Sequence, residues 1–434
     1  MNLTQIAKNA KQAALQLSSI PTETKNRALK SIAEAIEKNK GQILKENKKD
    51  IALAEKEGIA KPLIKRLALD DGKIKEMVQG IHDVMKQEDP VGKTLASLEM
   101  DKDLVMYQVS VPIGVIGAVF ESRPDATVQV ACLCLKSGNA AILKGGKEAL
   151  NTNRILIRLM ANAAEKAGIP KNSLQLIETR EEVKEMLKLD QYIDLLIPRG
   201  SNAFVKFIQD NTKIPVLGHA EGICHVYIDK DADMKQAVNI AFDAKCQYPA
   251  VCNAMETLLV HKDMAKTFLP RIAARYKEAK VELRGDHKTR AILKGVKAAT
   301  EKDWSTEYND LILSIKVVSS AEEAIGHINR YGSKHTESIV TENPETAYAF
   351  LDKVDAAVVL HNASTRFSDG YRFGKGAEVG IATSKIHARG PVGLEGLVIY
   401  KYKVLGKGHI VKDYVGKNAK HFTHRKLDKK FGRK

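Results

Sequence analysis

Hydrophobic positions in the first ninety residues recur with the spacing of amphipathic helices. In the clearest stretch the apolar residues share one helical face: Ala28, Leu29, Ile32, Ala33 and Ile36. Thr22 stands where the N-cap of that helix is expected, and residues 70–86 repeat the pattern. Residues 1–90 are therefore predicted to be helical.

The pattern changes to that of strands after residue 100. DLVMYQVSV (103–111) alternates apolar and polar residues, and VIGAVF (115–120) is a continuous apolar run typical of a strand buried on both faces. Helical stretches separate further short apolar runs: AAILK (140–144), LQLIE (174–178), IDLLI (193–197), PVLG (215–218) and CHVYID (224–229). Because parallel strands need long crossover connections, this alternation predicts an α/β fold with helices on both faces of a parallel sheet.

Two α/β units follow from this order. Residues 112–230 have the pattern of a nucleotide-binding half, and a second unit begins with the helical stretch MKQAVNIAFDA (234–244). A length of 434 residues agrees with two or three domains. With 44% hydrophobic and 28% charged residues, the composition is that of a soluble globular protein.

The cysteines and the N-terminal segment bear on the compartment. Five cysteines, an odd number without paired CxxC spacing, indicate free thiols rather than a disulfide framework, and no His, Cys, Asp or Glu spacing predicts a metal site. The N-terminal segment lacks the apolar core of a signal peptide, and no apolar stretch is long enough for a membrane span. We therefore expect a cytoplasmic protein with neither a membrane partner nor a bound metal.

A formal net charge of +16 raises the question of nucleic acid. The lysines are spread along the chain, and only the tail HRKLDKKFGRK (424–434) forms a dense basic run. This distribution favours a solvated lysine-rich surface without a nucleic-acid partner. The same charge attracts anionic small molecules such as dinucleotides and acyl phosphates.

Cys252 is the first candidate for catalysis. It lies in QYPAVCNAMETLLV (247–260), in a loop before a strand at the junction of the two units, where clefts commonly form. A thiolate there can attack a carbonyl if amides, dipoles or cations lower its pKa from about 8.5. The alternative is a small buried apolar cysteine, which is what the sequence favours for Cys132, Cys134, Cys224 and Cys246.

Glycine-rich segments suggest places for phosphate. The dinucleotide fingerprint GxGxxG is missing after the first strand. LKGGKEA (143–149) and PRGSNAF (198–204) each place glycine between a strand end and a helix start, where amides and the helix dipole favour an anion; an ordinary capped turn is the alternative. FGKGAEVGIATSKIHARGPVGLEGL (373–397) holds six glycines and is either a ligand-contacting loop or an irregular connection. His219 and His225 are expected to be structural histidines.

These segments, in this order, resemble one known family. VPIGVIGAVFESRPDATVQVA, CLKSGNAAILKGGKEA, DLLIPRGSNAFVKFI, VCNAMETLLVH and the glycine-rich segment are similar to the γ-glutamyl phosphate reductases, also called glutamate-5-semialdehyde dehydrogenases. The similarity runs from about residue 5 to about residue 426. That family is a branch of the aldehyde dehydrogenase superfamily.

The resemblance implies an aldehyde dehydrogenase-like fold in three parts. These are a Rossmann-type NADP-binding domain (1–96 and 112–232), an α/β catalytic domain (233–385), and an oligomerisation element with a C-terminal tail (97–111 and 386–434). The last would pair the hairpin around 97–111 with a strand near 395–404. A homo-oligomer is implied.

The resemblance also implies the reaction, which is NADPH-dependent reduction of γ-glutamyl 5-phosphate to glutamate 5-semialdehyde in proline biosynthesis, downstream of a glutamate kinase that this chain could contact. Cys252 takes the nucleophile position and forms a thioester. The oxyanion would be bound by the Cys252 amide with Asn253 or Ser122.

Cofactor residues are carried over by motif. Lys144, with Gly145 beside it, matches the adenosine-ribose contact, and Gly200 with Ser201 matches the pyrophosphate turn. Lys147 stands where NAD-preferring relatives often have a glutamate, so a cation there favours the 2′-phosphate of NADP. Glu307 is a further candidate, for the nicotinamide ribose.

Substrate residues are carried over in the same way. Arg123 and Arg389 are candidates for the anionic groups, with a structural ion pair as the alternative for each. His219 falls where hydrolytic relatives have a water-activating glutamate, and the loss of that base would protect the thioester from water. Glu221 is only two residues away, however, and could restore the base. The rival functions are a hydrolytic or coenzyme A-acylating aldehyde dehydrogenase and a basic nucleic-acid-binding protein on an inactive enzyme fold.

Overall fold

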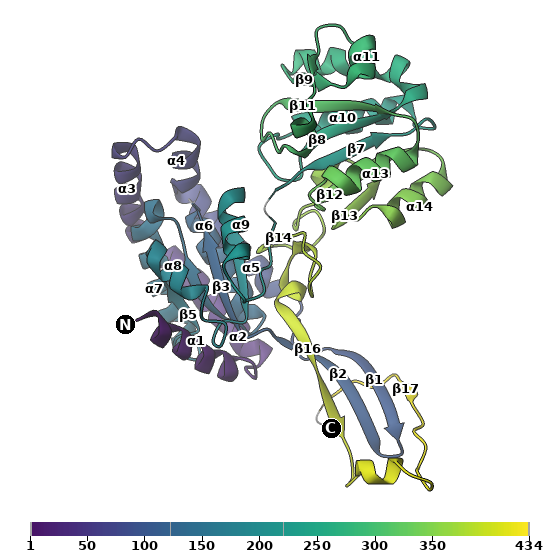
Figure 1. Cartoon of the computed structure of the whole chain (residues 1–434). Helices are drawn as coiled ribbons and strands as arrows, with labels where there is room; N and C mark the ends of the chain where they lie inside the picture. The colour runs from purple at the N-terminus through teal and green to yellow at the C-terminus, as the bar shows by residue number, and fades with distance from the viewer. Residues whose placement is uncertain (1, 122, 220, 433–434) are drawn as a thin grey trace.

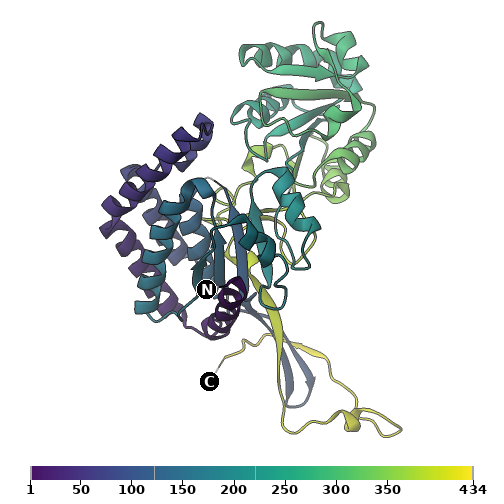
Figure 2. The same cartoon turned by 60° about the vertical axis from the view of Figure 1, so that its left-hand side comes forward.

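The computed structural model describes residues 2–121, 123–219 and 221–432. The molecule is elongated and consists of two α/β bodies and a β arm (Figure 1). The arm projects from the first body on the side away from the second body, and the turned view shows the same arrangement (Figure 2). Of the helices in the described part of the chain, none combines the length and apolar character that crossing a bilayer requires.

The first body begins with the predicted helices: α1 Leu3–Leu17, α2 Thr22–Lys38, α3 Lys40–Lys56, α4 Lys61–Leu67 and α5 Asp71–Lys86. The apolar face of α2 is buried. The predicted N-cap is wrong by one residue, because α2 starts at Thr22 and Pro21 precedes it as the cap. Thr22 is free for another partner, and its hydroxyl donates to Asp89 (2.7 Å).

A parallel four-stranded sheet of order β5-β4-β3-β6 forms the centre of this body. Its strands are β3 Val115–Phe120, β4 Ala140–Lys144, β5 Leu174–Leu176 and β6 Leu195–Arg199. Its crossover helices are α6 Pro124–Lys136, α7 Leu150–Lys166 and α8 Arg180–Met186, and α9 Asn202–Asp210 follows β6. Alternate residues of β3 enter two different cores, Ile116 and Phe120 on one face and Val115 and Val119 on the other. The sheet is therefore covered on both faces, as the continuous apolar runs predict.

The second body contains a parallel sheet of order β10-β9-β11-β8-β7-β12-β13. Its strands are β7 Cys224–Ile228, β8 Met255–His261, β9 Glu282–Gly285, β10 Lys297–Ala298, β11 Ile312–Val318, β12 Thr336–Val340 and β13 Val358–His361. Its helices are α10 Met234–Cys246, α11 Lys262–Glu278, α12 His287–Ile292, α13 Ala321–Tyr331 and α14 Pro344–Lys353. The expected boundary after residue 232 is wrong, because β7 pairs with β8 and β12 in this second sheet.

The arm is an antiparallel sheet of order β16-β2-β1-β17. It joins β1 Thr94–Asp101 and β2 Leu104–Pro112 to β16 Val398–Leu405, the C-terminal strand that the resemblance indicates, and to β17 Arg425–Leu427. The segment before β16 does not belong to the arm. It holds the hairpin of β14 Gly380–Ala382 and β15 Gly390–Val392, and its apolar residues join the first body's core: Ala377, Val379, Ala382, Val392, Leu394 and Leu397. The expected boundary at residue 385 is therefore also wrong.

Short 3₁₀ segments complete the described chain: η1 Lys147–Ala149, η2 Glu301–Ser305, η3 Thr365–Phe367, η4 Leu394–Leu397 and η5 Val411–Tyr414.

Candidate active site

Cys252 lies in the loop between α10 and β8, and neighbouring backbone holds that loop in place. The thiol of Cys224 donates to the carbonyl oxygen of Cys252 (3.2 Å). Gly222 packs directly against the same residue, since a Cβ at position 222 would lie 2.5 Å from the Cα of Cys252. Only glycine permits this approach, so the position of the cysteine depends on the chain just before β7.

Two histidines accompany the sulfur. One ring nitrogen each of His219 and His335 and the Sγ of Cys252 lie within 4.8 Å of one another. The two imidazoles meet edge to face, with ring centroids 4.9 Å apart. His219 Nδ1 lies 3.0 Å from the carbonyl oxygen of Ile381, which brings the glycine-rich segment to the site. Because a carbonyl only accepts, Nδ1 carries the hydrogen and Nε2 of the neutral ring has a free lone pair.

The surroundings of Cys252 keep its proton on the sulfur. Burial raises the pKa of the thiol to about 12, and the carboxylates of Glu307 and Glu378 act in the same direction, against the guanidinium of Arg199. Burial also lowers the pKa of His219, so its ring is neutral at physiological pH. A neutral imidazole beside a protonated thiol is an acceptor for that proton.

Two arginines face this region. Burial lowers the pKa of Arg199, which stands at the end of β6, and Arg123, Glu378 and Cys252 lie in its electrostatic environment. Its Nη1 is buried without a hydrogen-bond partner in the described chain. Arg366, in η3, donates through Nε to Gln247 of the cysteine loop (2.9 Å). An unpaired guanidinium nitrogen beside a nucleophile is suited to an anionic substrate group.

The helix start expected to bind phosphate after LKGGKEA is already occupied. Asp50 of α3 accepts hydrogen bonds from the backbone amides of Asn151 (3.1 Å) and Thr152 (2.8 Å), in the first turn of α7. Those two amides are therefore not open to an anion, and the prediction for the glycine turn at residues 143–149 stays a prediction. Lys144 is half-buried at the end of β4, and Lys147 is exposed and paired with Glu57 (2.8 Å).

The N-terminus of α9 remains open. Its N-cap is Ser201, whose side chain makes no capping hydrogen bond. A Cβ at Gly200 would lie 3.0 Å from side-chain atoms of both Glu121 and Phe204, so these two side chains leave little room for anything but glycine at this turn. An uncapped helix start behind a close glycine turn fits a pyrophosphate. The side-chain amide of Asn202 donates to the carboxylate of Glu307 in the second body (2.9 Å), and this contact joins the two bodies here.

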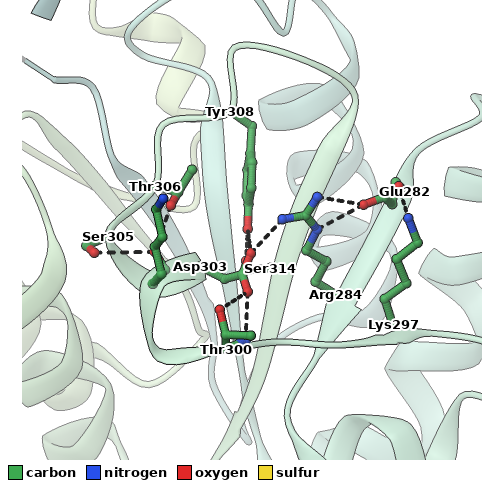
Figure 3. A network of polar contacts seen from close by, with 10 residues as sticks. Glu282, Arg284, Lys297, Thr300, Asp303, Ser305, Thr306, Tyr308 and Ser314 are labelled. Carbon is green, nitrogen blue, oxygen red and sulfur yellow. Dashed lines mark hydrogen bonds and ion pairs between the residues drawn. The ribbon is translucent and has the colours of Figure 1, made fainter.

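A polar network fixes the loop that carries Glu307 (Figure 3). Asp303 accepts from Arg284 (2.7 Å) and from the hydroxyl of Tyr308 (2.7 Å), and that hydroxyl also contacts Ser314 of β11 (2.7 Å). Burial raises the pKa of Asp303, but hydrogen bonds from Thr300 and Arg284 outweigh it and lower that pKa overall. Glu307 lies between the anchored Asp303 and Tyr308, so its position is set from both sides.

Comparison with known proteins identifies the family. Residues 1–291 match the model of the aldehyde dehydrogenase family. The γ-glutamyl phosphate reductase of Pelotomaculum thermopropionicum is 56% identical over 432 residues, which are 100% of this chain and 99% of that protein. The crystal structure of γ-glutamyl phosphate reductase from Thermotoga maritima superimposes with a TM-score of 0.93 at 45% identity and covers 94% of this chain and 100% of that one. The chain belongs to the γ-glutamyl phosphate reductase branch of the aldehyde dehydrogenase family.

A more distant structure shares the fold of this family. The glyceraldehyde-3-phosphate dehydrogenase GapN of Methanocaldococcus jannaschii, complexed with NADP, superimposes with a TM-score of 0.64 at 17% identity over 93% of this chain and 94% of that one.

The two arginines inferred from the likeness to γ-glutamyl phosphate reductases have partners within the chain. Arg389 contacts Asp355 (3.1 Å), which also binds Lys385 (2.9 Å), and these two cations lower the pKa of Asp355 to about 2, although burial opposes them. Arg123 pairs with Asp125 (2.6 Å). The structural ion pair, left open by the sequence, thus has its partner in both cases.

The remaining inferred positions differ in how they sit. The side-chain amide of Asn253 donates to the carbonyl oxygen of Ser368 (2.8 Å) and so ties the cysteine loop to η3. Glu221 is exposed, whereas His219 is in the cluster with Cys252. Ser122 lies outside the described residues. Sequence reasoning missed Arg199, although an arginine at a strand end directly before Gly200 was the available signal, and it missed His335, for which no motif exists.

Proposed function

We propose that this chain reduces γ-glutamyl 5-phosphate to glutamate 5-semialdehyde and phosphate with NADPH, as a step of proline biosynthesis. The proposal depends on one observation above all, which is 56% identity over the whole length of a γ-glutamyl phosphate reductase. The geometry around Cys252 supports it, because the chemistry needs a nucleophile, a proton acceptor and a cation at one place.

Cys252 is the nucleophile in this proposal. The lone pair on Nε2 of His219 accepts the thiol proton, and the sulfur attacks the γ-acyl carbon. The bond from that carbon to the phosphate oxygen breaks, phosphate leaves, and a thioester forms on Cys252. The backbone amide at position 252 and a further donor, for which Asn253 and Ser122 are the candidates, stabilise the oxyanion. After reduction the sulfur leaves as the aldehyde carbonyl forms.

The cofactor is NADPH, which when bound supplies the hydride that reduces the thioester. Gly200 and Ser201 at the start of α9 hold the pyrophosphate, and Lys144, with Gly145 beside it, contacts the adenosine ribose. Lys147 attracts the 2′-phosphate that distinguishes NADP from NAD. Glu307 accepts from the nicotinamide ribose in place of its present donor, Asn202.

Substrate anions are bound by Arg199 and Arg366, since both guanidinium groups lie within electrostatic range of the cysteine, with Arg123 and Arg389 as further cations around the site. His219 occupies the place of the water-activating glutamate of hydrolytic relatives and acts on the cysteine proton instead. The thioester is thereby reserved for hydride.

The arm is the oligomerisation element in this proposal. β16 exposes several large apolar side chains along its length, Ile399, Tyr400, Tyr402, Val404 and Leu405. The glutamate kinase that makes the labile acyl phosphate is the partner from which the chain receives its substrate.

The test runs the reaction backward, because glutamate semialdehyde is easier to supply than the acyl phosphate. Oxidation of the semialdehyde with NADP⁺ should require inorganic phosphate and should disappear in Cys252→Ala, with NADPH binding and thermal unfolding unchanged. Oxidation that ignores phosphate would favour a hydrolytic or coenzyme A-acylating enzyme, and full activity of Cys252→Ala would refute the mechanism. Cys246→Ala is the matched control, because Cys246 ends α10 outside the cysteine loop.

A further inference from the structure

Three side chains that ligate metals meet beside the catalytic sulfur. His219 lies between α9 and β7, Cys252 precedes β8, and His335 directly precedes β12, so they come from three separate segments. One ring nitrogen of each histidine and the Sγ of Cys252 lie within 4.8 Å of one another. No other group of three His, Cys, Asp or Glu residues in the described chain converges in this way.

The hydrogen bonds of the two rings leave the same nitrogen open on each. Nδ1 of His219 donates to the carbonyl oxygen of Ile381 (3.0 Å), and Nδ1 of His335 lies 2.8 Å from the hydroxyl of Thr336. Metal-binding histidines commonly engage their second nitrogen with an oxygen in this manner, which fixes the tautomer and the ring orientation. Nε2 of His219 is therefore available, and Nε2 of His335 is available in the tautomer whose Nδ1 donates to the hydroxyl of Thr336.

His335 supplies the independent sign of a ligand. Its side chain is fully buried, and its Nε2 has no hydrogen-bond partner in the described chain. A buried polar nitrogen without a partner is destabilising, so such atoms normally have a hydrogen-bond partner or a ligand. The reaction proposed above uses His219 and Cys252 and gives His335 no task.

A thiolate with two neutral imidazoles is a donor set suited to Zn²⁺. Zinc binds cysteine sulfur at about 2.3 Å and histidine nitrogen at about 2.0–2.1 Å in tetrahedral geometry, which separates neighbouring ligand atoms by about 3.3–3.6 Å. The three atoms, now within 4.8 Å, would each move inward by about 1 Å or less, a shift that side-chain rotation supplies. Three protein ligands leave a fourth position for water, as in other open zinc sites.

We propose that Cys252, His219 and His335 bind one Zn²⁺ ion through Sγ and the two Nε2 atoms, and that bound zinc reversibly inhibits the reductase. The thiol proton is released to solvent as the S–Zn bond forms, and no redox change occurs. The inhibitory part of the proposal rests on the proposed function, because it requires Cys252 to be the nucleophile. The binding part does not.

Inhibition follows because zinc and the reaction need the same lone pairs, one on Sγ of Cys252 and one on Nε2 of His219. Sulfur bonded to zinc cannot attack the acyl carbon, and His219 bonded to zinc cannot accept a proton. Zinc and the acyl substrate are therefore mutually exclusive, and a chelator restores activity.

The binding test uses the reduced, metal-free full-length chain without substrate or cofactor. Zn²⁺ is titrated against a chromophoric chelator, and Co²⁺ is added separately to detect the thiolate-to-cobalt charge-transfer band of a sulfur ligand. We expect one tight site per chain. Cys252→Ala and His219→Asn should each weaken it by about 100-fold or more, above what loss of an outer-shell partner costs. Cys246→Ala should bind zinc as the wild type does, because Cys246 lies outside the cluster.

His335→Asn should weaken zinc binding to the same extent. If this substitution at a buried position unfolds the chain, His219→Asn still decides the test. In the wild type, Zn²⁺ should also protect Cys252 from iodoacetamide, as measured by mass spectrometry. Unchanged zinc affinity in Cys252→Ala, or no protection, overturns the site. If the chain binds Zn²⁺ tightly but never oxidises the semialdehyde, the proposed function is refuted and the proposed zinc site is supported. Phosphate-dependent activity that saturating zinc does not inhibit overturns the inhibitory role.

Discussion

Replacing Gly222 with alanine tests whether the backbone before β7 sets the position of the nucleophile. The added Cβ would lie 2.5 Å from the Cα of Cys252, whereas unstrained carbon atoms approach to about 3.5–4.0 Å. The backbone segments at Gly222 and Cys252 must therefore separate by about 1 Å. The atoms of Cys252 that the new Cβ meets are backbone atoms, which cannot rotate away. A misplacement of that size at a reacting group costs about 100-fold in rate, or about 2.7 kcal/mol of transition-state stabilisation.

The assay is kcat/KM for phosphate-dependent semialdehyde oxidation, with NADPH binding followed by fluorescence. We expect kcat/KM to fall about 100-fold while NADPH affinity changes little, because α9 and Lys144 belong to the first body and Glu307 lies in another loop of the second body. Gly326→Ala is the matched control: Gly326 lies in α13 with no atom within 4 Å of the added Cβ, so this variant should keep full activity. Wild-type kinetics in Gly222→Ala would refute the reasoning.

Three further predictions concern charge. Lys147→Glu should shift the preference from NADP to NAD. Because Glu57 pairs with that lysine, adding Glu57→Gln should partly restore the lost affinity for NADP. An unchanged ratio of the two cofactor affinities would exclude Lys147 from recognition of the 2′-phosphate. Arg199→Met should lower kcat/KM by about 100-fold or more through loss of a charge-assisted contact, and Arg199→Lys should recover only part of it; wild-type kinetics in Arg199→Met would assign substrate binding elsewhere. Alkylation of Cys252 in the cofactor-free chain should keep rising above pH 10, because its thiol pKa is raised to about 12, and a plateau near pH 9 would contradict that electrostatic account.

The parallel strands were predictable where apolar residues run without interruption. VIGAVF became β3 and AAILK became β4, because a strand buried on both faces has no polar positions. PVLG formed only a single bridge, Val216 to Leu196, and Pro215 has no N–H for a ladder. The short edge strand β10 escaped prediction because its two residues are exposed and carry no apolar pattern.

Which sheet a strand joins was beyond the sequence argument. The run containing β7 looks like the runs before it, and its partners β8 and β12 are fixed only by long-range packing. For the same reason the sequence identified Cys252, which carries its own local signal, but not its cluster with His335. Spacing motifs find ligands that share one helix or loop, and these come from separate segments. Asp50 shows the converse, because a helix start open to anions by sequence is capped by a residue from another helix.

Glu307 connects the two halves of the proposed chemistry. Its carboxylate accepts from Asn202 at the start of α9, and after burial it is the largest influence that keeps the proton on Cys252. The network around Asp303 and Tyr308 holds its loop, so the carboxylate cannot simply retreat from the sulfur. A cofactor whose hydroxyl groups donate to Glu307 would spread that negative charge and so favour the thiolate. By reciprocity, ionisation of Cys252 would then change cofactor affinity to the same extent, which gives binding of cofactor before acylation a physical cause.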